Sequence, residues 1–136
     1  MSKEKILAVD DDPTVRWMLA EALRGWGHVP LEAEAVAGAG AAFNAQSPAV
    51  VLLDIELPDG SGLDALPEIK RRDPDAVVII ITGNVSVEHA VSALRGGAYD
   101  FVSKPIHLEE LRARIRNGLE ARRLRREVVR MRSARA

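Results

Sequence analysis

Two uninterrupted apolar runs constrain the fold more than any other feature of this chain. They read AVVLLD at residues 49–54 and AVVIIIT at residues 76–82. A strand with one face in water alternates apolar and polar residues, whereas a strand buried on both faces is apolar throughout. Three further runs rich in apolar residues, at 5–9, 28–33 and 99–104, complete a set of five. The sequence therefore predicts five strands, of which at least two are covered on both sides.

Helical spacing of apolar residues fills the intervals between these runs. The predicted helices begin at Pro13, a residue suited to the first helical position, and then cover 36–45, Leu63 to near Pro74, 87–94 and 108–119. Strand and helix thus alternate five times, which indicates a parallel sheet with helices on both faces. The expected fold is α/β, a flavodoxin-like doubly wound (βα)5 with a five-stranded parallel sheet in the order 2-1-3-4-5.

Polar side chains stand where four of the five predicted strands end. Three carboxylates follow the first strand, and single polar residues end the third, fourth and fifth, the full set being Asp10, Asp11, Asp12, Asp54, Thr82 and Lys104. The carboxyl ends of parallel strands meet at one edge of the sheet, and ligands bind there where the strand order reverses. We therefore expect these side chains to gather in one crevice.

This set of side chains predicts phosphoryl chemistry assisted by a metal ion. Adjacent carboxylates repel one another and need a cation nearby. Oxygen ligands without histidine suit a hard cation, Mg²⁺ or Mn²⁺. The ammonium of Lys104 and the hydroxyl of Thr82 can then bind phosphoryl oxygens, and one carboxylate can attack phosphorus to form an aspartyl phosphate.

Four stretches, taken in order, resemble the receiver domain of two-component response regulators. They read ILAVDDDP, VVLLDIELPDGSGLD, VVIIITG and YDFVSKP, and the details look most like the receivers of enhancer-binding, nitrogen-regulator-type transcriptional activators. The resemblance implies that Asp54 accepts a phosphoryl group from a sensor histidine kinase in an Mg²⁺-dependent reaction. It implies a switch that controls an output, here transcription, and not a turnover enzyme.

The resemblance also assigns roles to individual residues. Asp11 would bind Mg²⁺ directly, with Asp10 in support, an intervening water being one option, and with Asp54 and the backbone carbonyl of Glu56 as further ligands. Thr82 and Phe101 would form the switch pair, in which the hydroxyl turns toward the phosphoryl group and the ring turns inward. Lys104 would bind the phosphoryl group, and Lys104–Pro105 resembles the cis peptide of the family. Asp12 stays open between a metal role and an N-cap of the first helix.

Composition limits the other possibilities. The chain has 136 residues, is 47% hydrophobic and contains no cysteine, so disulfides and thiolate metal sites are excluded. It contains no apolar run near the roughly 20 residues of a membrane span, and the N-terminal MSKEK lacks the apolar stretch of a signal peptide. We expect a cytoplasmic protein without membrane contacts.

The C-terminal end differs from the rest of the chain in charge. Residues 112–136 carry ten arginines against Glu120 and Glu127. We predict a receiver domain at 1–119 and an arginine-rich helical extension, or linker, at 120–136. Two apolar stripes lie on different sides of the predicted helix, and consist of Leu111, Ile115 and Leu119, and of Leu124, Val128 and Met131.

This change of side predicts that the first stripe packs on the sheet and the second on a partner. We expect a homodimer through the face formed by the fourth helix, fifth strand and fifth helix, through the C-terminal helix, or through both. A nucleic-acid patch is the alternative for the arginines, although interleaved aromatic residues are lacking. Otherwise DNA would be contacted only through an output domain that these residues do not contain.

Two other functions share parts of the pattern. ILAVDDDPT also fits haloacid-dehalogenase-like phosphatases, with Asp10 as the nucleophile, but nothing after Lys104 supplies the further acidic pair of that family. A flavin-binding module would need amide donors for phosphate after the first strand, where DDDP would repel one. The receiver remains the stronger interpretation.

Overall fold

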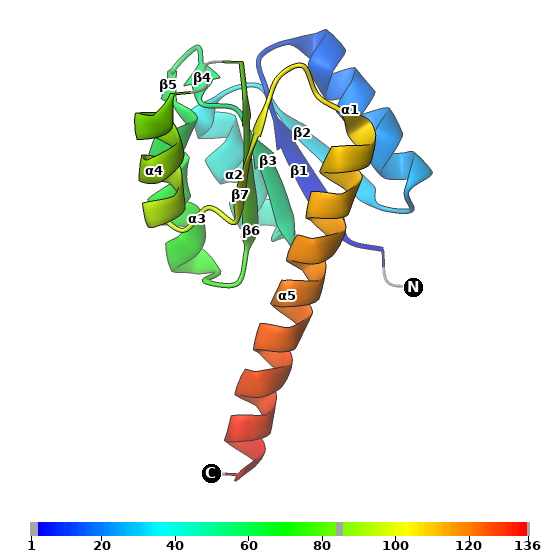
Figure 1. Cartoon of the computed structure of the whole chain (residues 1–136), viewed down its shortest axis with the longest axis vertical. Helices are drawn as coiled ribbons and strands as arrows, with labels where there is room; N and C mark the ends of the chain where they lie inside the picture. Colours follow the sequence, from blue (N-terminus) through cyan, green and yellow to red (C-terminus); the bar gives the residue numbers. More distant parts are fainter. Residues whose placement is uncertain (1–2, 84–85, 136) are drawn as a thin grey trace.

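The fold is a five-stranded parallel sheet between two layers of helices (Figure 1). The computed structural model describes residues 3–83 and 86–135, so Met1, Ser2 and Ala136, which the predicted domain boundaries include, lie outside it. The strands of the sheet are β1 (Lys5–Val9), β2 (Val29–Ala33), β3 (Val50–Leu53), β6 (Val77–Thr82) and β7 (Asp100–Ser103). Their order is β2-β1-β3-β6-β7, all parallel, which confirms the predicted 2-1-3-4-5 topology.

Each face of the sheet has its own core of buried apolar side chains. One face is covered by α1 (Pro13–Gly25) and α5 (Leu108–Arg135), the other by α2 (Val36–Gln46), α3 (Leu66–Arg72) and α4 (Val87–Arg95). All residues of β3 and β6 are buried, as expected for strands covered on both sides. Alternate residues therefore serve the two cores, with Ile80 in one and Ile79 in the other.

The segment between β3 and α3 differs in detail from the prediction. A short hairpin, β4 (Glu56–Leu57) and β5 (Gly60–Ser61), precedes a 3₁₀ turn, η1 (Gly62–Ala65), where a continuous third helix was expected. The α-helix starts at Leu66, with Pro67 in its first turn. Proline is well placed there because an amide at that position has no partner within the helix.

Helix α5 continues well past the sheet (Figure 1). It is unbroken from Leu108 to Arg135, and the division into a receiver domain at 1–119 and an extension at 120–136 stays a prediction. Leu111 and Ile115 are fully buried against the sheet, whereas Leu124 and Val128 are about half exposed. The apolar side of the helix therefore changes as predicted. None of the helices in the described part of the chain is both long and apolar enough to span a membrane.

Candidate functional site

The predicted site residues gather at the carboxyl edge of the sheet. Asp10 follows β1, and Asp54 follows the neighbouring strand β3. Backbone hydrogen bonds hold both at this edge, since the amide of Asp54 donates to Val9 O at 3.0 Å and that of Asp10 to Ala33 O at 3.1 Å. An open pocket forms there, lined by Asp10, Asp11, Asp12, Asp54, Glu56, Thr82, Gly83 and Lys104.

Three carboxylates lie close enough together to share one cation. Asp10, Asp11 and Asp54 each offer an oxygen within 4.8 Å of the other two. Asp10 and Asp54 are only 2% and 5% exposed, so their charges are poorly screened by water, whereas Asp11 is exposed. All three donors are carboxylate oxygens, and this donor set fits Mg²⁺ or Mn²⁺.

Lys104 supplies the positive charge within the cluster itself. Its Nζ lies 2.7 Å from Asp10 Oδ2 and 3.1 Å from Asp54 Oδ2. Burial lowers the pKa of Lys104, but hydrogen bonds and charge from the two carboxylates outweigh burial, so that its pKa is raised above the ordinary value. The ammonium therefore stays charged, and the Lys104–Pro105 peptide bond is cis, as the resemblance implied.

The two buried carboxylates are oriented by backbone amides. Asp54 Oδ1 accepts a hydrogen bond from the amide of Glu56 at 3.2 Å, and Asp10 Oδ1 accepts one from the amide of Asp12 at 2.9 Å. The Arg16 guanidinium donates to the Asp10 carbonyl at 2.7 Å. Each carboxylate thus has one oxygen fixed by the backbone and one beside Lys104.

Asp12 caps the first helix. Its Oδ1 accepts a hydrogen bond from the amide of Thr14 at 2.9 Å, so the N-cap alternative is observed. Asp12 also lines the pocket, but it is not among the three carboxylates that lie within 4.8 Å of one another. Glu56 also lines the pocket. That its backbone carbonyl binds a metal ion stays a prediction.

Thr82 and Phe101 lie on neighbouring strands and point to the same face of the sheet. Phe101 is opposite Ile80, and Thr82 follows Ile80 by two residues. Thr82 is buried at the pocket, while Phe101 is half-buried and packs on the core beneath α2, α3 and α4. The pair therefore connects the pocket to that core, and its switching role stays a prediction.

Sequence reasoning missed two residues that position the site. A Cβ added at Gly62 would lie 1.9 Å from Asp54 O, so only glycine allows this close approach. Asp59 accepts hydrogen bonds from the amides of Val36 at 2.7 Å and Ala37 at 3.0 Å. The stretch PDGSG indicates a turn, but the sequence does not indicate that Asp59 contacts the backbone at the start of α2.

Comparison with known proteins identifies the family. The model of the response regulator receiver domain matches residues 6–116, which is most of the chain. The chain belongs to this family. The receiver expectation is thereby confirmed, and the phosphatase alternative with Asp10 as nucleophile is not favoured.

The chain is similar to parts of longer regulatory proteins, among them the DNA-binding transcriptional regulator NtrC of Proteus hauseri, at 35% identity over 88% of this chain and 25% of that one. It is 40% identical to the nitrogen assimilation regulatory protein NtrX of Azorhizobium caulinodans over 126 residues, which are 90% of this chain and 28% of that protein. It is 36% identical to the photosynthetic apparatus regulatory protein RegA of Rhodovulum sulfidophilum, over 85% of this chain and 63% of that one. The chain therefore spans less than two thirds of these relatives.

Solved structures agree with the sequence matches. NtrX from Brucella abortus has a TM-score of 0.88 and 39% identity, with 96% of this chain and 30% of that one covered. A CheY-like receiver domain protein from Methanospirillum hungatei has a TM-score of 0.88 and 27% identity, with 91% of this chain and 99% of that one covered. The fold and the relation to NtrC- and NtrX-type regulators, expected from the sequence, are confirmed.

Proposed function

We propose that this receiver accepts a phosphoryl group on Asp54 from a phosphohistidine of a sensor kinase, in the cytoplasm, and thereby controls transcription through an output domain that binds DNA. The observation that carries the proposal is the buried cluster of Asp10 and Asp54 with Lys104 at 2.7 Å and 3.1 Å, beside the exposed Asp11. A carboxylate nucleophile, cation ligands and a fixed ammonium are thus adjacent.

The transfer follows from these positions. A carboxylate oxygen of Asp54 attacks phosphorus and forms the new oxygen–phosphorus bond. The nitrogen–phosphorus bond of the donor breaks, its electron pair passes to the ring nitrogen, and the imidazole, which carries a proton on its other nitrogen, leaves as the neutral ring. The Glu56 amide holds the Asp54 carboxyl in orientation, and Lys104 is already within reach of the phosphoryl oxygens. Positioning and charge neutralisation are the main contributions a protein makes to such a transfer.

Asp11, Asp10 and Asp54, with the Glu56 carbonyl, would hold Mg²⁺ or Mn²⁺. When bound, the ion supplies positive charge to the phosphoryl oxygens. Lys104 neutralises only part of the negative charge of the three carboxylates, so the residues present fit an additional cation. The exposed Asp11 is the ligand that faces the solvent, from which the ion arrives.

Phosphorylation would shift an equilibrium between two conformations of the chain. Thr82 lies at the pocket and donates its hydroxyl to the phosphoryl group, and Phe101 then moves further into the core that it already contacts. The surface of α4 and β7 changes in consequence. The receiver acts as a switch, phosphorylated and dephosphorylated at Asp54 alone, and turns over no other substrate.

Intact-mass spectrometry after incubation with acetyl phosphate tests the proposal. We expect a gain of one phosphoryl group with Mg²⁺ and none with EDTA. Asp54→Asn should abolish the gain, whereas Asp64→Asn, at an exposed acid in η1, should leave it unchanged. A label that forms equally in EDTA or in the Asp54 variant would overturn the proposal.

A further inference from the structure

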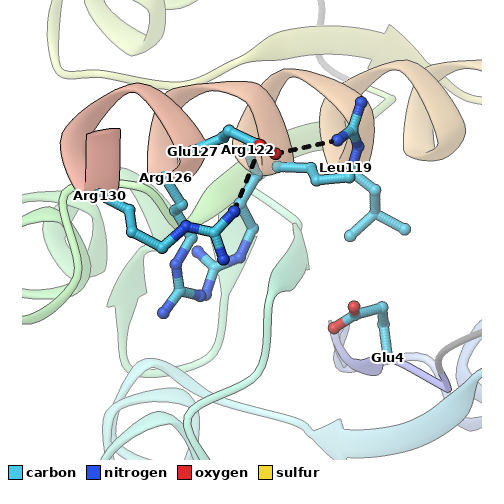
Figure 2. Close-up of a pocket in the computed structure, with 7 residues that line it drawn as sticks. Glu4, Leu119, Arg122, Arg126, Glu127 and Arg130 are labelled. Carbon is cyan, nitrogen blue, oxygen red and sulfur yellow. Dashed lines mark hydrogen bonds and ion pairs between the residues drawn. The ribbon is translucent and has the colours of Figure 1, made fainter. Parts of the chain in front are cut away.

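A groove runs along α5, on the side that faces the start of β1. One pocket of about 500 Å³ lies between α5 and Glu4 (Figure 2). A second pocket, of about 430 Å³, lies between α5 and the C-cap residue of α1, Trp26. The two pockets share Glu4, Leu119 and Arg123 in their linings, and they therefore form one continuous groove.

Arginines follow the groove at helical spacing. Six of the α5 residues that line it are separated by four, three, four, three and four positions, and these are Arg112, Arg116, Leu119, Arg123, Arg126 and Arg130. This spacing places them on one side of the helix. From position 112 to position 130 the helix rises by about 27 Å, so the row of guanidinium groups is long enough to follow an extended ligand.

The groove carries more positive than negative charge. Six arginines line it against three glutamates. Two of these glutamates are already paired, since Arg123 lies 2.6 Å from Glu120 and 3.4 Å from Glu127. Three of the lining arginines make no ion pair with any residue that the structure describes, namely Arg112, Arg116 and Arg126. Their guanidinium groups are therefore available to an anionic ligand.

Trp26 supplies the aromatic surface that residues 112–136 lack. Its side chain is only partly buried, and the Arg112 guanidinium lies over its ring, 5.7 Å from the centroid. Ile115 and Leu119 add apolar surface to the same pocket. An aromatic ring beside a row of unpaired cations is the combination that binds single-stranded nucleic acid, because bases stack on the ring while the cations follow the phosphates.

We propose that this groove binds a single strand of nucleic acid, with one base stacked on Trp26 and the phosphates along the arginines of α5. At the spacing of about 3.4 Å per phosphate in a stacked strand, roughly eight phosphates match the length of the row. The groove lies at the amino edge of the sheet, where Glu4 and His28 precede β1 and β2, whereas Asp54 lies at the opposite edge. Binding therefore stands apart from phosphorylation, and the failure of either proposal leaves the other intact.

Fluorescence anisotropy with a labelled oligothymidylate of about twelve nucleotides tests binding to the full chain, after nuclease and high-salt treatment. We expect a dissociation constant of about 10⁻⁵ M near physiological salt. The logarithm of the binding constant should fall with the logarithm of the salt concentration at a slope of about −2, because three unpaired arginines each displace about 0.7 counterions from a single strand. No binding at low salt, or tighter binding of a duplex of equal length, would overturn the proposal.

Matched arginine substitutions test the groove itself. Arg116 and Arg132 are both exposed, but Arg132 lies about 160° around α5 from Arg116 and does not line the groove. We expect Arg116→Gln to weaken binding about fivefold near 0.1 M salt and to reduce the salt slope by about 0.7. Arg132→Gln should change neither quantity. Equal losses in the two variants would show attraction to the charge of the helix as a whole and would overturn binding in the groove.

The two tryptophans of the chain provide a matched test of stacking. Trp17, in α1, is 65% exposed and does not line the groove. We expect Trp26→Leu to weaken binding about tenfold and Trp17→Leu to leave it unchanged, with circular dichroism as the check that both variants fold. Equal affinities of the two variants would overturn stacking on Trp26.

Tryptophan fluorescence tests stacking without any change at position 26. In Trp17→Leu the only remaining tryptophan is Trp26, so its emission reports on the groove alone. We expect the oligothymidylate to quench this emission at saturation and inorganic tripolyphosphate, which has no base, to leave it nearly unchanged. Saturation by the strand without quenching, or binding of tripolyphosphate as tight as that of the strand, would show a site for phosphate alone and would overturn the proposal.

Discussion

Lys104 Nζ lies 3.1 Å from Asp54 Oδ2, although fifty positions separate the two residues. The same ammonium lies 2.7 Å from Asp10 Oδ2, so one side chain joins the acids of two neighbouring strands. Two carboxylates that are almost fully buried would otherwise repel each other without screening. The lysine therefore stabilises the fold at the same place where we propose that it binds the phosphoryl group.

Replacement of Lys104 should separate its contribution to stability from that of a metal ion. We expect Lys104→Met to lower the free energy of unfolding by about 1–3 kcal/mol without metal, because two buried carboxylates lose their cation. Added Mg²⁺ should then stabilise the variant more than the wild type. Thermal unfolding with EDTA and with Mg²⁺ measures both effects.

Lys5→Met provides the control, since the Lys5 ammonium hydrogen-bonds to Gln46 at the surface, away from the carboxylate cluster, and its loss should change neither quantity. The pKa of Lys104 is raised in the fold, so its stabilisation is complete below its ordinary value of 10.5 and is lost as the pH rises through the folded pKa. A Lys104→Met variant as stable as the wild type in EDTA would contradict this account.

Substitution by alanine should have opposite effects on stability at two of the glycines. A Cβ at Gly62 would lie 1.9 Å from Asp54 O, so we expect Gly62→Ala to cost about 2–4 kcal/mol and to displace the backbone of Asp54. At Gly40 in α2 nothing lies within 4 Å of the added atom, and Gly40→Ala should stabilise by about 0.5–1 kcal/mol. Chemical denaturation of both variants measures these changes, and equal effects would argue against the close approach at Asp54.

Asp59 should hold the start of α2 in place. The N-cap residue of this helix, Ala35, offers no side-chain acceptor, and both carboxylate oxygens of Asp59 accept hydrogen bonds from the first amides of α2 instead. We expect Asp59→Ala to lower the melting temperature and to speed amide hydrogen exchange at Val36 and Ala37. Asp59→Asn should retain part of the protection, because one acceptor oxygen remains.

The pH dependence of this contact has a defined sign. Hydrogen bonds from the amides of Ala37 and Val36 lower the pKa of Asp59 below its ordinary value. Its stabilisation is therefore present above the unfolded pKa and is lost as the pH falls through the folded pKa. Hydrogen exchange at these two amides that is unaffected by Asp59→Ala would show that the cap is not needed.

Much of this receiver could be predicted from its sequence because its signals are local. Apolar runs fix the buried strands, and polar residues at strand ends fix the site once the sheet order is known, so that Asp10, Asp54, Thr82 and Lys104 converge as expected. The contact of Asp59 joins two segments that are distant in the sequence, and Gly62 is required by the close approach of its Cα to the carbonyl oxygen of Asp54. Such contacts leave no periodic signal, and therefore only the structure reveals them.

His28 should make stability depend on pH near neutrality. Burial lowers the pKa of His28 below its ordinary value of 6.5, the carboxylate of Glu4 opposes this shift, and Arg112 adds to it. The unfolded chain therefore takes up a proton at a higher pH than the folded chain. We expect the free energy of unfolding to fall as the pH falls below 6.5, until the folded histidine is also protonated.

Denaturant unfolding of the wild type and His28→Gln, across this pH range, measures the effect. The variant should lose the part of the dependence due to His28, while His107→Gln, at an exposed histidine before α5, should retain it. A pH dependence that is identical in all three proteins would show that His28 titrates alike in the folded and unfolded chains.

The most direct test of the proposed function is the position of the phosphoryl label. Borohydride reduction converts an aspartyl phosphate to a stable alcohol, and trypsin then separates the two candidate sites, since residues 6–16 contain Asp10 and residues 25–70 contain Asp54. After labelling with acetyl phosphate and Mg²⁺, we expect the reduced residue at position 54 and none at position 10. Reduction at position 10, with position 54 unmodified, would contradict the assignment of Asp54 as the phosphoryl acceptor.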